Sequence, residues 1–125
     1  IRIRTGEDLA RAVAKLRKRV GPSDIVVTRG SEGMTCFADG ESAGVDVHTL
    51  AREVFDVHGA GDTTIAALEL ARAVGASLLE AAVIANAAAG VVVGKIGTAT
   101  VSRDEIREIL PTAIAAAQAR TEAAP

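Results

Sequence analysis

Hydrophobic positions recur along the first third of this chain at two periods, which predict one helix and three strands. Residues 7–19 carry apolar side chains at helical spacing, with charged residues on the opposite face. The run 25–27 (Ile-Val-Val) is short and β-branched, which is typical of a central strand in a parallel sheet. Two further runs, 34–38 and 41–47, flank Asp39-Gly40, a strong turn signal. This part of the chain therefore predicts a helix, a strand and a β-hairpin.

The middle of the chain predicts a short strand, a glycine turn and a helix. Residues 52–57 have the pattern of an extended segment, and Gly59-Ala60-Gly61 follows them. Apolar residues then recur at helical spacing as far as Gly75, which is a natural helix end. These residues are Ile65, Leu68, Ala71 and Val74.

Two capping boxes, each a serine followed three residues later by a glutamate, predict where the last two helices begin. The boxes are Ser77 with Glu80 and Ser102 with Glu105. The first helix runs towards Gly94, and its lack of charge after the cap indicates burial on most sides. The second is predicted to run to about Ala117, and residues 115–125 are expected to fray.

Composition narrows the class of protein. A chain of 125 residues, 49% of them hydrophobic, fits a single α/β domain over 1–125. The net charge of −2 gives no reason to expect a nucleic-acid partner. The longest uncharged stretch, 81–94, contains Asn86 and has the pattern of a buried helix, so we expect no membrane span. The N-terminus lacks a basic region followed by an apolar one, so we expect no signal peptide. The single cysteine, Cys36, lies in an apolar run and is predicted to be structural, in a reducing, cytoplasmic compartment.

The turn at Gly59-Ala60-Gly61 has the composition of an anion site. Glycines at the start of a helix let backbone N–H groups converge without interference from Cβ atoms, and the helix dipole adds positive charge. Asp62 stands in the first helical turn beside this turn. A carboxylate next to an oxyanion site is what phosphoryl transfer to a hydroxyl needs. The alternative is that Asp62 is only a helix-capping acid.

Spacing argues against three other kinds of site. The run Gly90–Ile96 is one residue short of a P-loop, and Ile96 stands where a serine or threonine must bind magnesium. Thr64 replaces the third glycine of a dinucleotide fingerprint. His48 and His58 have no neighbours at metal-ligand spacing, which argues against zinc.

Three segments in order resemble the ribokinase-like carbohydrate kinases. Residues 56–62 resemble the family's motif for the anion hole and catalytic base, and 27–33 resemble its nucleotide loop. Residues 85–101 closely resemble the heptose 7-phosphate kinase branch. The resemblance implies that the chain is the C-terminal, nucleotide-binding part of a ribokinase-like α/β/α sandwich. The family's sugar-binding N-terminal half has no counterpart in this chain.

The resemblance also implies roles for individual residues. Asp62 would be the catalytic base, and the N–H groups of Gly59, Ala60 and Gly61 would form the anion hole. The residues expected to line the ATP pocket are Thr28, Gly30, Gly33 and Asn86. Because Asn86 is a polar side chain among apolar ones, it must bond either an internal partner or a ligand; by resemblance it faces the adenine.

The metals implied by resemblance are Mg²⁺, bridging the ATP phosphates, and a monovalent cation such as K⁺. The backbone carbonyls expected to hold the monovalent cation are those of Asp56, His58, Val92, Lys95 and Gly97. His58 departs from the family motif, in which a threonine often stands at this position. Its imidazole is expected either to crowd the turn or to place a pH-sensitive charge beside the phosphates.

The function implied by resemblance is transfer of a phosphoryl group from ATP to a sugar phosphate, with heptose 7-phosphate becoming heptose 1,7-bisphosphate. That reaction belongs to ADP-heptose synthesis, towards lipopolysaccharide. The alternative is a non-catalytic nucleotide-binding fragment that self-associates. Apolar surface and a sheet edge left uncovered by the N-terminal half would favour a homo-oligomer, and we expect little or no sugar phosphorylation by this chain alone.

Overall fold

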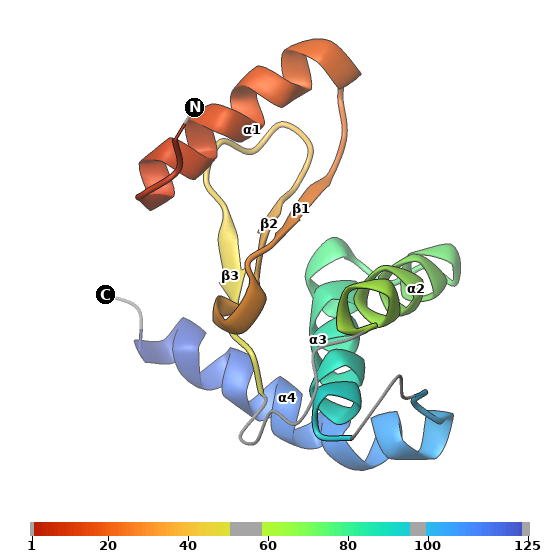
Figure 1. The fold of residues 1–125 in the computed structure, drawn as a ribbon. Helices are drawn as coiled ribbons and strands as arrows, with labels where there is room; N and C mark the ends of the chain where they lie inside the picture. Colours follow the sequence, from red (N-terminus) through yellow and green to blue (C-terminus); the bar gives the residue numbers. More distant parts are fainter. Residues whose placement is uncertain (1, 51–58, 96–99, 124–125) are drawn as a thin grey trace.

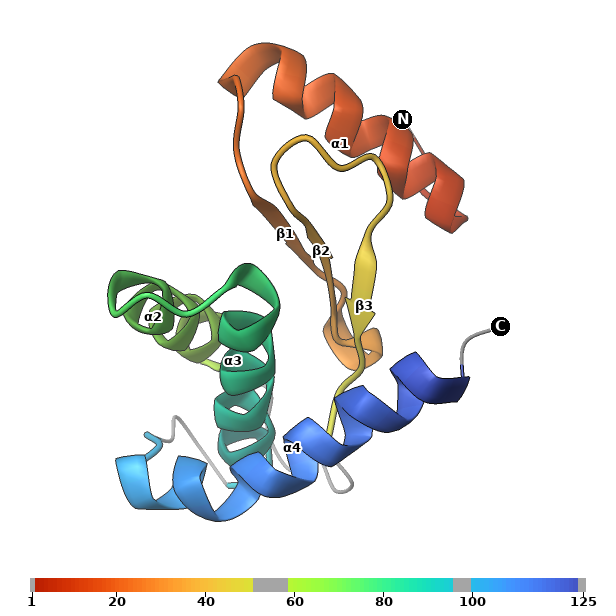
Figure 2. The same cartoon turned by 180° about the vertical axis from the view of Figure 1, so that it is seen from behind.

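A small sheet lies between one helix on one face and a group of helices on the other. The computed structural model describes residues 2–50, 59–95 and 100–123. Helix α1 lies across one end of the sheet and α4 across the other (Figures 1 and 2). The elements in chain order are α1 (Gly6–Val20), β1 (Ile25–Thr28), a 3₁₀ turn η1 (Gly30–Glu32), β2 (Met34–Phe37), β3 (Val45–Val47), α2 (Ala60–Ala73), α3 (Leu78–Val93) and α4 (Arg103–Ala123).

The described sheet is antiparallel with strand order β1-β2-β3. Thr28 lies opposite Met34, and Met34 lies opposite Val47. The expectation that β1 is a central strand among parallel neighbours is therefore wrong for this sheet, in which β1 is an edge strand. The connection from β1 to β2 contains only η1 and its flanking residues, whereas a parallel pairing needs a crossover of about a dozen residues.

The predicted hairpin is confirmed, but its second strand is shorter than expected. The Glu41 N–H donates to the Ala38 carbonyl at 2.9 Å, and Gly40 has a φ of 81°. β3 nevertheless begins at Val45 rather than Glu41. The Arg17 guanidinium donates to the carbonyls of Phe37, Ala38 and Glu41. These bonds hold the loop between β2 and β3 against α1, so its residues do not extend the sheet. Arg17 is thus a structural anchor, although its basic neighbours suggested a solvated face.

Side chains alternate between the two faces of the sheet and build two separate clusters. The cluster on the α1 side consists of Leu9, Val13, Ile25, Val27 and Phe37. The cluster on the other side consists of Val26, Met34, Cys36, Val47, Ala67, Leu68, Leu78, Ala82 and Ala85. Because α1 covers one face and α2 and α3 cover the other, β2 is buried along its whole length.

The helices begin where the sequence predicts, but the last one ends later than predicted. The Ser77 and Ser102 capping boxes both form. Ile65 of α2 is 59% exposed, and Val74, the C-cap of this helix, is 87% exposed, so only part of the apolar stripe packs. α4 continues to Ala123 instead of ending near residue 117. Its inner face packs on α3 through Ile109, Leu110, Ala113 and Ala117, in contacts that the alanine-rich sequence does not reveal.

Helix α3 is packed through alanine methyl groups. Five alanines are fully buried: Ala81, Ala82, Ala85, Ala87 and Ala88. Small side chains let neighbouring backbones approach closely, and burial on most sides was predicted from the lack of charge. None of the helices described is long and apolar enough to cross a membrane.

The Cys36 thiol is buried, as predicted, and has no sign of activation. Its side chain is 3% exposed in β2. Burial raises the pKa of this thiol to about 11, and the charge of Asp46 acts in the same direction. The thiol is therefore neutral at physiological pH and serves packing.

Gly33 is tightly constrained by its close approach to β3. It has a φ of 92° and a ψ of −127°, a conformation nearly exclusive to glycine. A Cβ at this position would overlap the Val47 carbonyl oxygen and lie 2.9 Å from the His48 Cα. By contrast, a Cβ at Gly30, whose φ is 58°, would meet nothing within 4 Å.

We expect Gly33→Ala to lower the free energy of unfolding by about 2–4 kcal/mol, from backbone strain and the clash with β3 together. Gly30→Ala is the matched control and should lower it by about 1 kcal/mol, because it adds strain without a clash. Both changes stiffen the unfolded chain equally. Urea denaturation followed by circular dichroism measures the difference, and equal losses in the two variants would contradict the close approach of Gly33 to Val47.

Candidate functional site

A cavity of about 380 Å³ lies where the η1 loop, the chain after β3, the start of α2 and the middle of α3 meet. Its volume is within the range of small-molecule sites. It is lined by Thr28, Gly30, Ser31, Gly33, Met34, Thr49, Ala60, Gly61, Thr64, Asn86, Ala89 and Val93. Six of these residues were predicted as site residues from the sequence: Thr28, Gly30, Gly33, Ala60, Gly61 and Asn86. The structure thus brings the two predicted glycine segments to one cavity.

The η1 loop forms one wall of the cavity and is closed by backbone hydrogen bonds. The Arg29 N–H donates to the Gly33 carbonyl at 2.7 Å, and the Gly33 N–H donates to the Gly30 carbonyl at 3.1 Å. Both glycines have positive φ values. A loop of this kind keeps side chains away from its inner side, so a ligand can approach the backbone.

The start of α2 forms a second wall. Gly59 is the N-cap in a left-handed conformation with a φ of 79°, and it supplies no side-chain cap. The first N–H groups of a helix have no acceptor within the helix. Ala60 and Gly61 carry such groups and line the cavity, where the helix dipole favours negative charge. This geometry is compatible with the predicted anion hole, whose role stays a prediction.

Asp62 lies in the first turn of α2 and is exposed to solvent. It does not line the cavity itself, but it directly follows Gly61, which does. An exposed carboxylate at this position can meet a second molecule that approaches the cavity from outside. Its role as a base stays a prediction.

Asn86 finds an internal hydrogen-bond partner. It lies on α3, is 6% exposed, and its Nδ2 donates to the His48 carbonyl at 2.7 Å. This bond holds the chain that follows β3 against α3 and so fixes the wall that contains Thr49. Of the two partners left open by the sequence, an internal acceptor is confirmed. That Asn86 also faces adenine stays a prediction, although it lines the cavity.

The predicted monovalent-cation site is largely outside the part of the chain that the structure describes. Asp56, His58 and Gly97 all lie outside the described residues. The Val92 carbonyl, at the end of α3, accepts the Lys95 N–H at 3.1 Å. The side chain of Lys95 bonds Glu105 at 2.6 Å, and this lowers the pKa of the Glu105 carboxyl. The cation site therefore stays a prediction.

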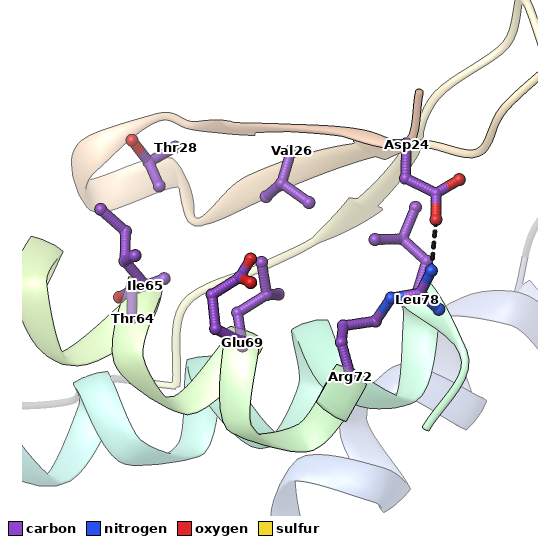
Figure 3. A pocket seen from close by; sticks show the side chains of 9 residues that line it. Asp24, Val26, Thr28, Thr64, Ile65, Glu69, Arg72 and Leu78 are labelled. Carbon is purple, nitrogen blue, oxygen red and sulfur yellow. Dashed lines mark hydrogen bonds and ion pairs between the residues drawn. The ribbon is translucent and has the colours of Figure 1, made fainter. Parts of the chain in front are cut away.

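A second hollow of about 350 Å³ lies between β1 and α2 (Figure 3). Thr28 and Thr64 line both hollows, so the two adjoin. In Figure 3, Val26 points from β1 towards α2, and Arg72 of α2 reaches Asp24 in an ion pair of 2.6 Å. This hollow was not predicted, because its walls come from elements whose pairing the sequence does not specify.

Thr64 is the clearest site residue that the sequence reasoning missed. It is 7% exposed, and its Oγ1 donates to the Ala60 carbonyl at 2.8 Å within the first turns of α2. Its position four residues after Ala60, on the face next to Leu68, was a signal that it would point inwards. Met34, Ala89 and Val93 supply the apolar part of the cavity and were not among the predicted site residues, since the sequence placed them only in a hairpin strand and in a buried helix.

The sequence of this chain is similar to a known family and to curated proteins. The pattern of the pfkB family carbohydrate kinases matches residues 2–105. The bifunctional protein HldE of Desulfatibacillum aliphaticivorans is 47% identical over 120 residues, which are 96% of this chain and 24% of that protein. The bifunctional protein HldE of a Nitratiruptor species is 51% identical over 106 residues, 85% of this chain and 22% of that protein. The chain thus spans about a quarter of the length of these relatives.

Solved structures share the fold. Ribokinase of Arabidopsis thaliana, solved with ribose and ATP, superposes with a TM-score of 0.78 at 34% identity, over 85% of this chain and 34% of that one. Phosphofructokinase-2 of Escherichia coli, solved with potassium, superposes with a TM-score of 0.77 at 24% identity over 90% of this chain and 36% of that one, a likeness of fold alone. The predicted ribokinase-like α/β class is confirmed. The chain belongs to the pfkB family of carbohydrate kinases.

Proposed function

We propose that this chain is the nucleotide-binding part of an ATP-dependent sugar kinase and that the cavity between η1 and α2 takes ATP. One observation carries the proposal: a single cavity joins an uncapped helix start at Ala60-Gly61 to the glycine loop Gly30–Gly33. The helix start supplies N–H groups that can bind phosphates. The apolar side chains of Met34, Ala89 and Val93 supply a surface on which a base can lie.

In this proposal Asp62 is the general base. It takes the proton of a sugar hydroxyl as that oxygen forms a bond to the γ-phosphorus of ATP, and the bond from that phosphorus to the β–γ bridging oxygen breaks, which leaves ADP. The N–H groups at Gly59, Ala60 and Gly61 stabilise the charge on the transferred group. Support comes from the exposure of Asp62 at the rim of the cavity, where a second substrate can reach it.

Mg²⁺ would be held mainly by the nucleotide. The described residues contain no group of three or more His, Cys, Asp or Glu side chains that could hold a metal ion. Mg²⁺ in kinases is usually bound by one or two carboxylates together with substrate phosphates, so the donor set here is compatible with a nucleotide-borne ion. When bound, Mg²⁺ neutralises charge on the phosphates. K⁺ on the carbonyls of Asp56, His58, Val92, Lys95 and Gly97 is part of the same proposal.

The acceptor in this proposal is a sugar phosphate, heptose 7-phosphate, and the product is heptose 1,7-bisphosphate for ADP-heptose synthesis. Two observations support it. Residues 85–101 resemble the heptose 7-phosphate kinase branch. The identity of 47–51% to proteins named HldE is higher than the 34% to ribokinase. The setting for this reaction is the cytoplasm, where ATP is available.

Calorimetric titration with ATP and Mg²⁺ tests the nucleotide site. We expect saturable binding to the wild-type chain and to Asp62→Asn with similar dissociation constants, because Asp62 serves the chemistry rather than the affinity. Asp104→Asn, which removes an exposed acid from the first turn of α4 instead, is the matched control for the change in charge. If ATP does not bind the wild-type chain, the proposal fails. A large loss confined to Asp62→Asn would mean that Asp62 acts in binding.

A second candidate is a nucleotide-binding chain without turnover that self-associates. A specific observation favours it: Ile65 of α2 lines the hollow beside β1 and is 59% exposed. β1 is an edge of the described sheet beside α2, and such edges pair with other strands. An exposed apolar side chain beside an edge of the described sheet is a feature of interaction surfaces. We infer that a second copy of this chain covers it.

Sedimentation equilibrium tests self-association. We expect the wild-type chain to form a dimer and Ile65→Glu to shift the equilibrium to monomer, because a charge would be buried in the hollow beside β1. Ile114→Glu, at a 43% exposed residue of α4, is the control and should leave the dimer intact. A wild-type chain that stays monomeric at high concentration would contradict the inference. Sugar phosphorylation by the chain alone would exclude this candidate.

A further inference from the structure

The side chain of Arg29 crosses the sheet immediately behind the η1 loop. Its Nη1 donates to the Thr35 Oγ1 at 3.4 Å, and that hydroxyl donates to the Asp46 carboxylate at 2.7 Å. The same Nη1 lies 3.7 Å from Asp46, and Nη2 donates to Glu32 at 2.8 Å. One guanidinium thus connects the end of β1 to β2, β3 and the η1 loop.

The Arg29 network and the cavity lie on opposite faces of the sheet. Thr28 and Met34 line the cavity, while Arg29 and Thr35 are their neighbours in sequence and point to the other face of the strands. Arg29 therefore does not contact a ligand in the cavity. It acts through the backbone, since its own N–H donates to Gly33 at 2.7 Å and closes the loop.

The loop depends on such an anchor because packing does little to hold it. Gly30, Ser31 and Glu32 are exposed, and a Cβ at Gly30 would meet no atom within 4 Å. Glycines with positive φ also lose much conformational freedom when they are fixed. The guanidinium pairs with Glu32 inside the loop and with Asp46 on β3, so it ties this glycine-containing segment to the sheet.

The energetics favour a network over separate pairs. A lone exposed ion pair contributes about 0–1 kcal/mol, and the Arg29 side chain is 35% exposed. Thr35, however, is 4% exposed, so its hydroxyl needs the partners that it finds in Arg29 and Asp46. Removing the arginine would leave the Thr35 hydroxyl with Asp46 as its only partner in this network. The carboxylates of Glu32 and Asp46 would also lose the cation that they share.

We propose that Arg29 is a positioning residue for the nucleotide: it pre-orders the Gly30–Gly33 loop from the back of the sheet. The inference rests on the proposed function, because it assumes that the cavity takes ATP. If the loop is already ordered in the free chain, the entropy cost of ordering it does not reduce the free energy of nucleotide binding. Loss of Arg29 should therefore weaken nucleotide binding without removing any group that contacts the nucleotide.

The test compares Arg29→Met, which keeps the aliphatic stem, with Arg29→Lys and with Arg107→Met. Arg107 is also an arginine in an i,i+3 ion pair, but it lies 70% exposed on α4 and serves as the matched control. For each chain, calorimetry gives the dissociation constant of ATP with Mg²⁺. Hydrogen exchange without nucleotide gives the protection of the amides at 30–33.

We expect Arg29→Met to raise the dissociation constant about fivefold to tenfold and to speed amide exchange at 30–33 in the free chain. Arg29→Lys should restore part of the ATP affinity and part of the amide protection, because an ammonium can pair with one carboxylate but lacks the second arm of the guanidinium. Arg107→Met should match the wild type. A structural role alone would lower stability without changing the exchange at 30–33 relative to the rest of the chain, and that result would overturn the inference.

Two further outcomes separate this inference from the proposed function. If the wild-type chain binds ATP and Arg29→Met binds it equally well, the inference is wrong and the nucleotide site stands. If the wild-type chain binds no ATP, the proposed function fails and the role of Arg29 in nucleotide binding fails with it.

Discussion

Burial of β2 on both faces is the constraint on which the rest of the structure depends. All four of its residues are only 2–4% exposed, so helices must cover the sheet on both sides. α1 meets this requirement on one face, and α2 with α3 meets it on the other. The one hydroxyl side chain in the strand, Thr35, obtains its partners from Arg29 and Asp46. Because β2 begins at Met34, the same strand also fixes where the glycine loop opens onto the cavity.

Local signals in the sequence were enough to predict most elements. Capping boxes at Ser77 and Ser102 form as predicted, and the glycine turns at Gly40 and Gly59 adopt positive φ values. These features depend on a few neighbouring residues, so no knowledge of the fold is needed to place them. The motif residues Gly30, Gly33, Ala60, Gly61 and Asn86 also meet at one cavity. Their chemical roles remain predictions.

What the sequence did not reveal depends on contacts between distant segments. Arg17 has the pattern of a solvated cation until the hairpin loop is placed beside it. Ile65 and Val74 are 59% and 87% exposed, which the periodicity of residues 65–74 cannot show, because it does not tell which elements pack on α2. The antiparallel pairing of β1 is set by the short η1 connection rather than by the composition of the strand. The hydrophobic pattern predicts which elements form, whereas their packing partners come from topology.

The order of contacts along the chain has a consequence for how the molecule folds. β1, β2 and β3 pair in sequence order with α1 packed on them, and α2, α3 and α4 pack in sequence order as well. Each half is therefore built from neighbours and needs little loop-closure entropy, which favours rapid formation. The contacts of α2 and α3 with the sheet join the halves, and the cavity lies along that junction. This order of contacts predicts that the cavity that carries the candidate chemistry is the last part of the fold to take shape.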